Sequence, residues 1–201
     1  AIKLSEESNL ISNENTIIGN TVLYGATSGK LFAAGLAGDR FAVRNSGATT
    51  VIEGCDSNGC EYMTGGTVVI LGEVGDNFAA GMTGGMAFIY DKTLQFEKKV
   101  NPDSVVWQNV ETDYWKKFLK KLVTEHLNET GSELSRKIIQ NYEEEINNFV
   151  QVCPKEMLNK LASPISDKKA EKKLVVIKKG DHSLSSKKWL KILIKELNLV
   201  I

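Results

Sequence analysis

The sequence predicts a mainly β protein in which short strands wind into a parallel β-helix, followed by a small α-helical region. Three observations support this prediction. All but two of the 17 glycines lie between residues 17 and 91. In the same region, runs rich in Val, Ile, Phe and Thr recur about every 18–19 residues, and these residue types favour strands. After about residue 92 glycine almost disappears, and apolar residues recur at helical spacing.

The repeat is visible in the glycines that separate the apolar runs. Gly47, Gly66 and Gly85 stand 19 residues apart and each precedes such a run, while segment 38–43 recurs as 75–80. The predicted strand runs are Lys30–Ala33, Thr50–Ile52, Val68–Leu71 and Ala87–Tyr90. One coil of this length cannot bury its own apolar face, so stacked coils must shield one another. An antiparallel sandwich with glycine-rich hairpins is the alternative that the periodicity leaves open.

The region after the repeats is predicted to be mostly helical. A first helix is expected over residues 112–128, and a second is expected to open at Gly131–Ser132, with Ser132 as a suitable N-cap. Apolar residues on one side of this second helix are Leu134, Ile138, Ile139, Tyr142, Ile146 and Phe149. Pro154 is expected to begin a short last helix.

The composition divides the chain into four parts. We expect a polar lead-in over 1–16, the β-helix over 17–105, a helical extension packed on or beside it over 106–161, and a lysine-rich tail of unknown role over 162–201. In the tail, Leu174–Ile177 is a candidate strand and Trp189–Leu199 a candidate amphipathic helix.

The charges and the apolar runs exclude several classes of partner. Residues 1–91 hold four Lys/Arg and ten Asp/Glu, and the remainder holds 21 and 15, so halves of opposite charge could attract each other. The basic residues are too mixed with acidic ones to predict nucleic-acid binding. No apolar run is long enough to span a membrane, and residues 1–7 do not resemble a secretory signal. The three cysteines are an odd number and do not suggest a disulfide framework, so we expect a reducing, cytoplasmic location.

The histidines and cysteines do not predict an active site. His126 falls among charged residues of a predicted helix and His182 in a lysine-rich turn, so both are interpreted as solvated surface residues. Cys55 and Cys60 lie five positions apart, with Cys153 far away, whereas zinc or iron–sulfur sites need further soft ligands. We interpret the three cysteines as buried or corner thiols. No catalytic, cofactor-binding or metal-binding residue is predicted in this chain.

Two further motifs have ordinary structural interpretations. Arg40 and Arg44 alternate with Phe41 and Val43, so they are expected to share one strand face. They could bind an anion, but ion pairs with Glu53 or Glu61 are the favoured interpretation. The glycines of segment 25–30 precede a strand instead of a helix and lack the spacing of a nucleotide-binding loop.

Several motifs, taken together and in order, resemble the C-terminal domain of the glutamate synthase large subunit. The matching segments are 24–35, 39–48, 59–66, 77–85, 130–132 and 149–155. The resemblance covers roughly residues 17–161. It implies that the β-helix is right-handed and that the domain is structural, bracing an amidotransferase domain and a synthase domain that are held on other chains. FMN and the iron–sulfur cluster are expected only on those partner domains.

The resemblance also implies departures and alternatives. The family has further coils upstream, so we expect the end coil to be covered by residues 1–16 or by a second copy of the chain. Whether the chain belongs to a working enzyme stays open, because it could be a vestigial fragment of a glutamate synthase gene. It could also be an interaction subunit of another redox complex, similar to the β-helix subunit of formylmethanofuran dehydrogenases. A hexapeptide-type acyltransferase would need a catalytic histidine beside the coils, which the sequence does not offer.

Overall fold

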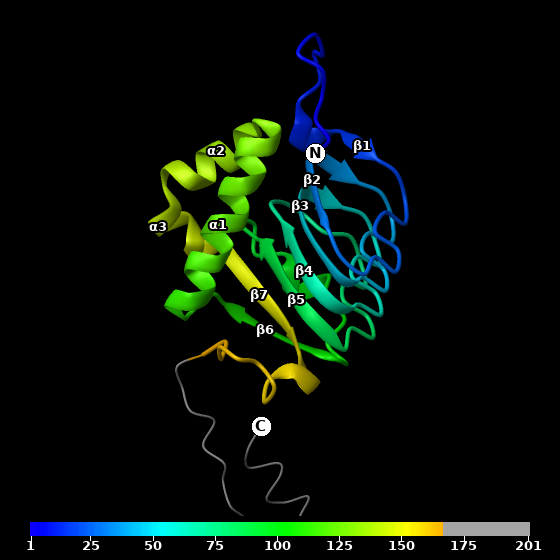
Figure 1. Cartoon of the computed structure of the whole chain (residues 1–201), viewed down its shortest axis with the longest axis vertical. Coiled ribbons are helices and arrows are strands. Elements are labelled where there is room, and N and C mark those ends of the chain that lie inside the picture. The colour runs from blue at the N-terminus through cyan, green and yellow to red at the C-terminus, as the bar shows by residue number, and fades with distance from the viewer. Residues whose placement is uncertain (167–201) are drawn as a thin grey trace, which may run out of the picture. The chain divides into compact units, whose positions relative to one another are not determined.

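The computed structural model describes residues 1–166 (Figure 1). The candidate strand 174–177, the candidate helix 189–199 and His182 lie outside the described residues. The strands of the described part are β1 (Thr16–Ile18), β2 (Lys30–Ala37), β3 (Ser46–Cys55), β4 (Thr64–Ile70), β5 (Gly84–Tyr90), β6 (Val105–Asn109) and β7 (Phe149–Pro154). Its α-helices are α1 (Asp113–Thr130), α2 (Glu133–Gln140) and α3 (Tyr142–Glu145). Its 3₁₀ turns are η1 (Ser12–Glu14), η2 (Phe96–Lys98), η3 (Ile146–Asn148) and η4 (Lys155–Met157).

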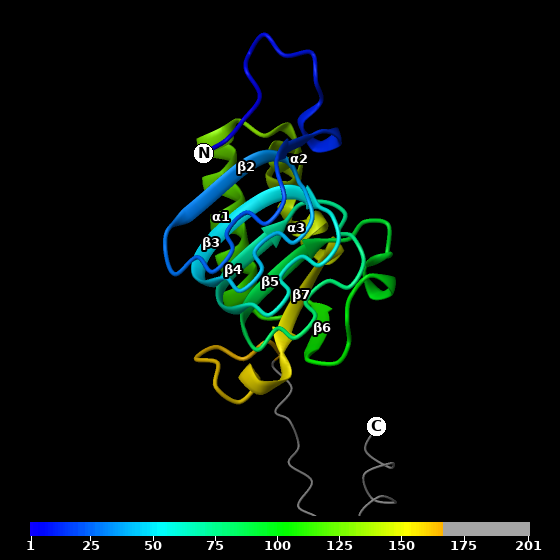
Figure 2. The same ribbon diagram turned by 90° about the vertical axis from the view of Figure 1, so that its right-hand side faces the viewer.

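Strands β1 to β5 pair in parallel and in chain order, as the coils of a β-helix must (Figures 1 and 2). Val51 lies opposite Phe32 on one side and Val69 on the other, and Val69 lies opposite Phe88. These partners are 19, 18 and 19 residues apart, so one coil corresponds to one sequence repeat. The predicted apolar runs are therefore the strands β2 to β5, and the antiparallel-sandwich alternative is wrong for this part of the chain.

The opposite side of each coil is not a regular strand. It consists of the segments 21–25, 40–44, 58–62 and 77–81, which we call the left-handed wall. Alternate residues in each segment have positive φ, for example Arg40 (60°), Ala42 (57°) and Arg44 (54°). The prediction that Arg40 and Arg44 lie on a strand face is wrong, because their backbone is left-handed.

Hydrogen bonds between coils hold the left-handed wall together. The backbone N–H of Ala42 donates to Val22 in the preceding coil (2.9 Å), and that of Cys60 donates to Phe41 (2.8 Å). The side chains of Ala42, Cys60 and Ala79 are fully buried inside the coils. These inward side chains and those of the facing strands form one apolar core within the β-helix.

Two antiparallel strands, which the sequence did not reveal, close the last coil. Strand β7 pairs antiparallel with β5, and β6 pairs antiparallel with β7. The prediction that a helix opened at 131–132 reaches Phe149 is wrong: α2 ends at Gln140, and Phe149 begins β7. Residues 149–154 alternate between the two faces of the sheet and are β-branched or aromatic at three positions, so the free edge of β5 selects them as a strand.

Strands β2 to β5 form the other side of each coil, which we call the strand wall. The helices cover its outer face (Figure 1). Helix α1 begins within a residue of its predicted start, and the Ser132 side chain caps α2 by accepting the N–H of Ser135 (3.1 Å). Outward strand residues such as Val69 and Phe88 pack with Trp115 and Leu119 of α1, forming a second apolar core. Pro154 precedes only the single 3₁₀ turn η4, which is shorter than the predicted helix.

The lead-in segment partly covers the first coil. Ile2 forms a parallel bridge with Ala33, its N–H donating to Phe32 (2.7 Å) and its carbonyl accepting from Ala34 (2.9 Å). Between Ile2 and η1 the chain forms a projecting loop (Figures 1 and 2). The expectation that residues 1–16 contribute to covering the end coil is thus confirmed at this one contact.

Candidate binding groove at the coil corners

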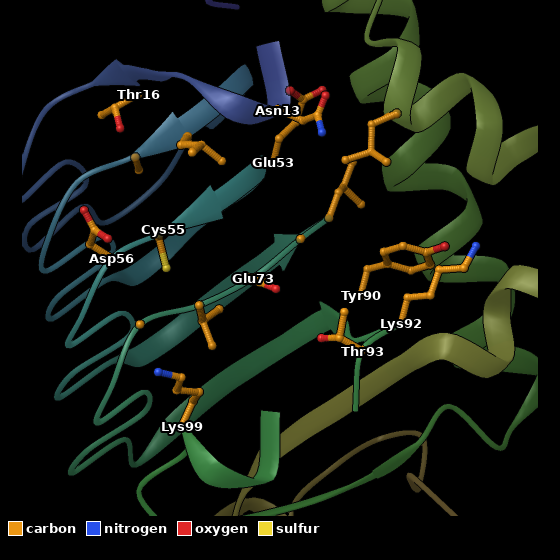
Figure 3. A pocket seen from close by; sticks show the side chains of 17 residues that line it. Asn13, Thr16, Glu53, Cys55, Asp56, Glu73, Tyr90, Lys92, Thr93 and Lys99 are labelled. Carbon is orange, nitrogen blue, oxygen red and sulfur yellow. The ribbon is translucent and has the colours of Figure 1, made fainter. Parts of the chain in front are cut away.

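A groove of about 540 Å³ runs along the carboxyl ends of β2 to β5 (Figure 3). In each coil the chain turns there from the strand wall into a corner. Glu53 and Cys55 line the groove from the end of β3, Glu73 from the corner after β4, and Lys92 from the corner after β5. Neighbouring coils in a parallel sheet lie about 4.8 Å apart, so a groove crossing four strands is roughly 14 Å long.

Glu53 is the unusual group in this groove. Its side chain is 1% exposed, and Oε1 accepts a hydrogen bond from the hydroxyl of Ser132. Oε2 has no hydrogen-bond partner among the described residues. Burial raises the pKa of Glu53, and the nearby hydroxyls of Ser132 and Ser12 lower it only in part. A buried carboxyl oxygen without a donor is costly, so this side chain calls for an explanation.

A second buried polar group, His126, is linked to Glu53 through two serines: Ser132 accepts the backbone N–H of Ser135, and Ser135 contacts His126. The Nδ1 atom of His126 lies 2.7 Å from the Ser135 hydroxyl, and Nε2 lies 3.1 Å from the carbonyl oxygen of Ala33. Because a carbonyl can only accept, Nε2 carries the proton and the Ser135 hydroxyl donates to Nδ1. The prediction that His126 is a solvated surface residue is wrong: its side chain is fully buried, on the side of α1 that faces β2. Burial lowers its pKa to about 4, so the ring is neutral.

The lysines of the groove already have acidic partners. Lys99 Nζ lies 2.8 Å from Asp76, and Lys92 Nζ lies 3.8 Å from Glu145, which also accepts from the Tyr90 hydroxyl (2.6 Å). Within residues 1–166, Asp56 and Glu73 form no ion pair within 4 Å. The acidic side of the groove therefore carries more uncompensated charge than the basic side.

The sequence could have indicated these groove carboxylates. Glu53 and Asp56 recur 20 positions later as Glu73 and Asp76, just after the apolar runs of two successive coils. Glu53 is predicted above only as an arginine partner. In the structure Arg40 pairs with Glu61 instead (3.3 Å), so the expected ion pair forms with the second of the two candidates.

The cysteines are buried thiols, as predicted. Cys55 is 8% exposed, and Cys60 and Cys153 are fully buried. Burial raises the pKa of Cys55 to about 12 and that of Cys153 to about 11. Thiols with such values are protonated at neutral pH and are poor nucleophiles. Over residues 1–166, no three His, Cys, Asp or Glu side chains are arranged to hold a metal ion, and no helix is long and apolar enough to cross a membrane.

Comparison with known proteins identifies the class to which this fold belongs. Residues 1–155 match the family model described as the GXGXG motif. The chain therefore belongs to the GXGXG motif family, and the resemblance seen in its sequence motifs is confirmed.

Relatives of this chain include glutamate synthases. The chain is 58% identical to the glutamate synthase (NADPH) large chain of Azospirillum brasilense over 169 residues, which cover 84% of this chain and 11% of that protein. It is 47% identical to the glutamate synthase (NADH) of Schizosaccharomyces pombe over 161 residues, 80% of this chain and 8% of that protein. It is also 47% identical to ferredoxin-dependent glutamate synthase 2 of Synechocystis sp. over 141 residues, 70% of this chain and 9% of that protein. The chain thus spans about a tenth of the length of these relatives.

Proposed function

We propose that this chain is a non-catalytic scaffold of a glutamate synthase, bracing amidotransferase and FMN-binding synthase domains held elsewhere. The observation that carries the proposal is the match of 84% of this chain to 11% of a glutamate synthase large chain at 58% identity. A match over 169 of the 201 residues includes both stacked coils and packed helices, so the relatives are expected to use the same rigid body. FMN and the iron–sulfur cluster would then belong to the partner domains.

The architecture suits a scaffold. Each coil is bonded to the next, and the antiparallel strands β7 and β6 close one end of the stack. A stack of this kind has two cores, one inside the coils and one under the helices, and it changes shape little on binding. Such a body can hold neighbouring domains at fixed positions while contributing no reacting group.

Complementation in trans tests this function. The matching segment would be deleted from the Azospirillum brasilense large chain, and the 201-residue chain would be supplied as a separate polypeptide. We expect the two to co-purify and glutamine-dependent glutamate formation to be restored in part. Co-purification without any gain in activity over the deleted enzyme would contradict the bracing role, as would flavin absorbance in the purified 201-residue chain alone.

A further inference from the structure

The Glu53 end of the groove has an acceptor without a donor. Glu53 Oε2 is buried and has no hydrogen-bond partner within residues 1–166, although the Ser12 hydroxyl of η1 lies near enough to lower the pKa of Glu53. The carboxylates of Asp56 and Glu73 lie along the same wall. Lys99 lies at the other end (Figure 3). It is already paired with Asp76. The Glu53 end is therefore the part of the groove that lacks a positive charge.

We propose that this end of the groove receives a lysine or arginine side chain carried by an extended segment of a partner domain, whose charged nitrogen donates to Glu53 Oε2. The proposal rests on the scaffold function, because it names the contact through which the scaffold holds a neighbour. Asn13 of the exposed turn η1 lines the same end, and its side chain makes no hydrogen bond among the described residues. Asn13 is thus the side chain that moves aside when the ligand enters.

A protein-borne cation fits the groove better than a metal ion or an anion does. A metal ion would need three suitable ligands together, and residues 1–166 offer no such group. An anion would need a free cation, whereas Lys92 and Lys99 both have carboxylate partners. The groove crosses the corners of four strands, a length that suits a few residues of extended chain and far exceeds a single ion.

The arrangement is not explained by the stability of the isolated chain. The isolated chain gains nothing from a second carboxyl oxygen at position 53, because the Ser132 hydroxyl donates only to Oε1 and burial of the unpaired Oε2 is costly. A carboxyl kept at that position gains only when a donor arrives, and a charge-assisted hydrogen bond is stronger than a neutral one. The groove thus has the character of a preformed site that a partner completes.

Peptide binding to the 201-residue chain tests the proposal. The probe is acetyl-Ala-Ala-Arg-Ala-Ala-amide, titrated by NMR, with the analogue that carries citrulline instead of arginine as its neutral control. We expect shifts at the groove residues with the arginine peptide only. Glu53→Gln should weaken binding at least about tenfold, and Glu73→Gln should weaken it less. The matched control is Glu97→Gln, an exposed glutamate outside the groove, which should bind as the parent does.

The thermal unfolding midpoint separates a binding role from a structural one. The Glu53→Gln variant should melt at or above the temperature of the parent chain at pH 8. A fall in the melting midpoint together with unchanged peptide affinity would overturn the proposal and make Glu53 a structural residue. Equal binding of the citrulline peptide would also overturn it, and methylguanidinium binding as tightly as the peptide would show that no extended segment is needed.

The two proposals fail separately. If the chain restores the deleted synthase in trans but Glu53→Gln and Glu73→Gln restore it equally well and bind the peptide unchanged, the scaffold stands and the cation site falls. If the peptide binds as expected but the chain never associates with the deleted synthase, the scaffold function falls, and with it the identity of the partner that the site receives.

Discussion

The two walls of each coil solve the same stacking problem in different ways. In the strand wall, β2 to β5 pair in register, and their side chains alternate between the inner core and the helices. In the left-handed wall, segments such as 40–44 also bond to the coils above and below, but alternate residues have positive φ. Each wall contributes fully buried side chains, such as Val69 in the strands and Ala79 in the left-handed wall, although Tyr24 and Tyr62 of the left-handed wall are exposed.

The difference shows where the stacking imposes a conformation. β-branched and aromatic residues favour the extended backbone of the strand wall. A left-handed backbone costs a non-glycine residue on the order of 1–2 kcal/mol, yet the left-handed wall places Thr21, Leu23 and Tyr62 there. The hydrogen bonds between coils and the burial of alternate side chains must offset that cost.

The largest loss of stability is expected from removing a buried phenylalanine from either apolar core. Equal losses would show that the two walls contribute alike to the free energy of unfolding. Phe88 of the strand wall packs on Trp115, and Phe78 of the left-handed wall packs on Phe96; both phenylalanines are fully buried. Phe88→Ala and Phe78→Ala should each lower the free energy of unfolding by about 4 kcal/mol, because each leaves a cavity. Urea unfolding measures this change in the free energy of unfolding. A loss below about 1 kcal/mol for Phe78→Ala alone would mean that the left-handed wall is loosely packed.

The next effect concerns the junction between the strand wall and the helices, where His126 is buried neutral. The folded-state pKa of His126 is about 4 and the ordinary value is 6.5, so the unfolded chain binds a proton between these values and the folded chain does not. The contribution of the neutral His126 ring to the free energy of unfolding is complete above pH 6.5. It falls by about 3 kcal/mol as the pH drops toward 4. The pKa of Glu53 is raised in the folded chain, so its effect on the free energy of unfolding has the opposite sign: stability falls as the pH rises.

Urea unfolding of the parent and of His126→Gln at pH 7.5 and pH 4.5 isolates this contribution, because both proteins share Glu53 and the remaining carboxyls. We expect the parent to lose more stability between the two pH values than the variant does. An equal loss in the two proteins would show that His126 protonates without leaving its contacts to Ser135 and Ala33.

A smaller effect is expected at a corner where the backbones of two coils lie close together. A Cβ atom added to Gly65 would lie 2.2 Å from the backbone oxygen of Ser46, whereas one added to Gly19 would meet nothing within 4 Å. Gly65→Ala should therefore destabilise by about 2 kcal/mol, and Gly19→Ala by less than about 0.5 kcal/mol. Thermal unfolding of this matched pair measures the difference. Equal effects would indicate that the coils separate easily at this corner.

The smallest effect distinguishes the backbones of the two walls most directly. Thr21 is exposed and has φ of 63°, while Thr49 lies in β3, paired with Lys30 and Thr67 on its two sides. Thr21→Gly should stabilise by about 0.5 kcal/mol, because it relieves a strained φ at some entropic cost. Thr49→Gly should destabilise by about 1 kcal/mol. Both values come from chemical denaturation, and a loss of stability on Thr21→Gly would contradict the assigned strain.

Much of the strand wall was predictable because its signal is local. Gly47, Gly66 and Gly85 mark the coil length, and the apolar runs after them are the strands that the structure contains. Strand β7 was missed because residues 149–154 pair with β5, about 60 positions earlier, and their own pattern does not exclude a helix turn. The groove was missed for a similar reason: its lining residues come from several coils, and the hydrogen-bond partner of Glu53 is Ser132, 79 residues later.

The sequence alone determined the repeat, the stacking of strands β2 to β5 in chain order, the start of α1 and the family, since each of these is written in residues close together along the chain. The tertiary structure decided the positive φ of Ala42, the burial of His126 and the unpaired oxygen of Glu53. Each depends on a contact with another coil or helix, such as the one between His126 and Ala33, 93 residues apart. Contacts of that range leave no local pattern, because the energy that favours them exists only once the coils have stacked.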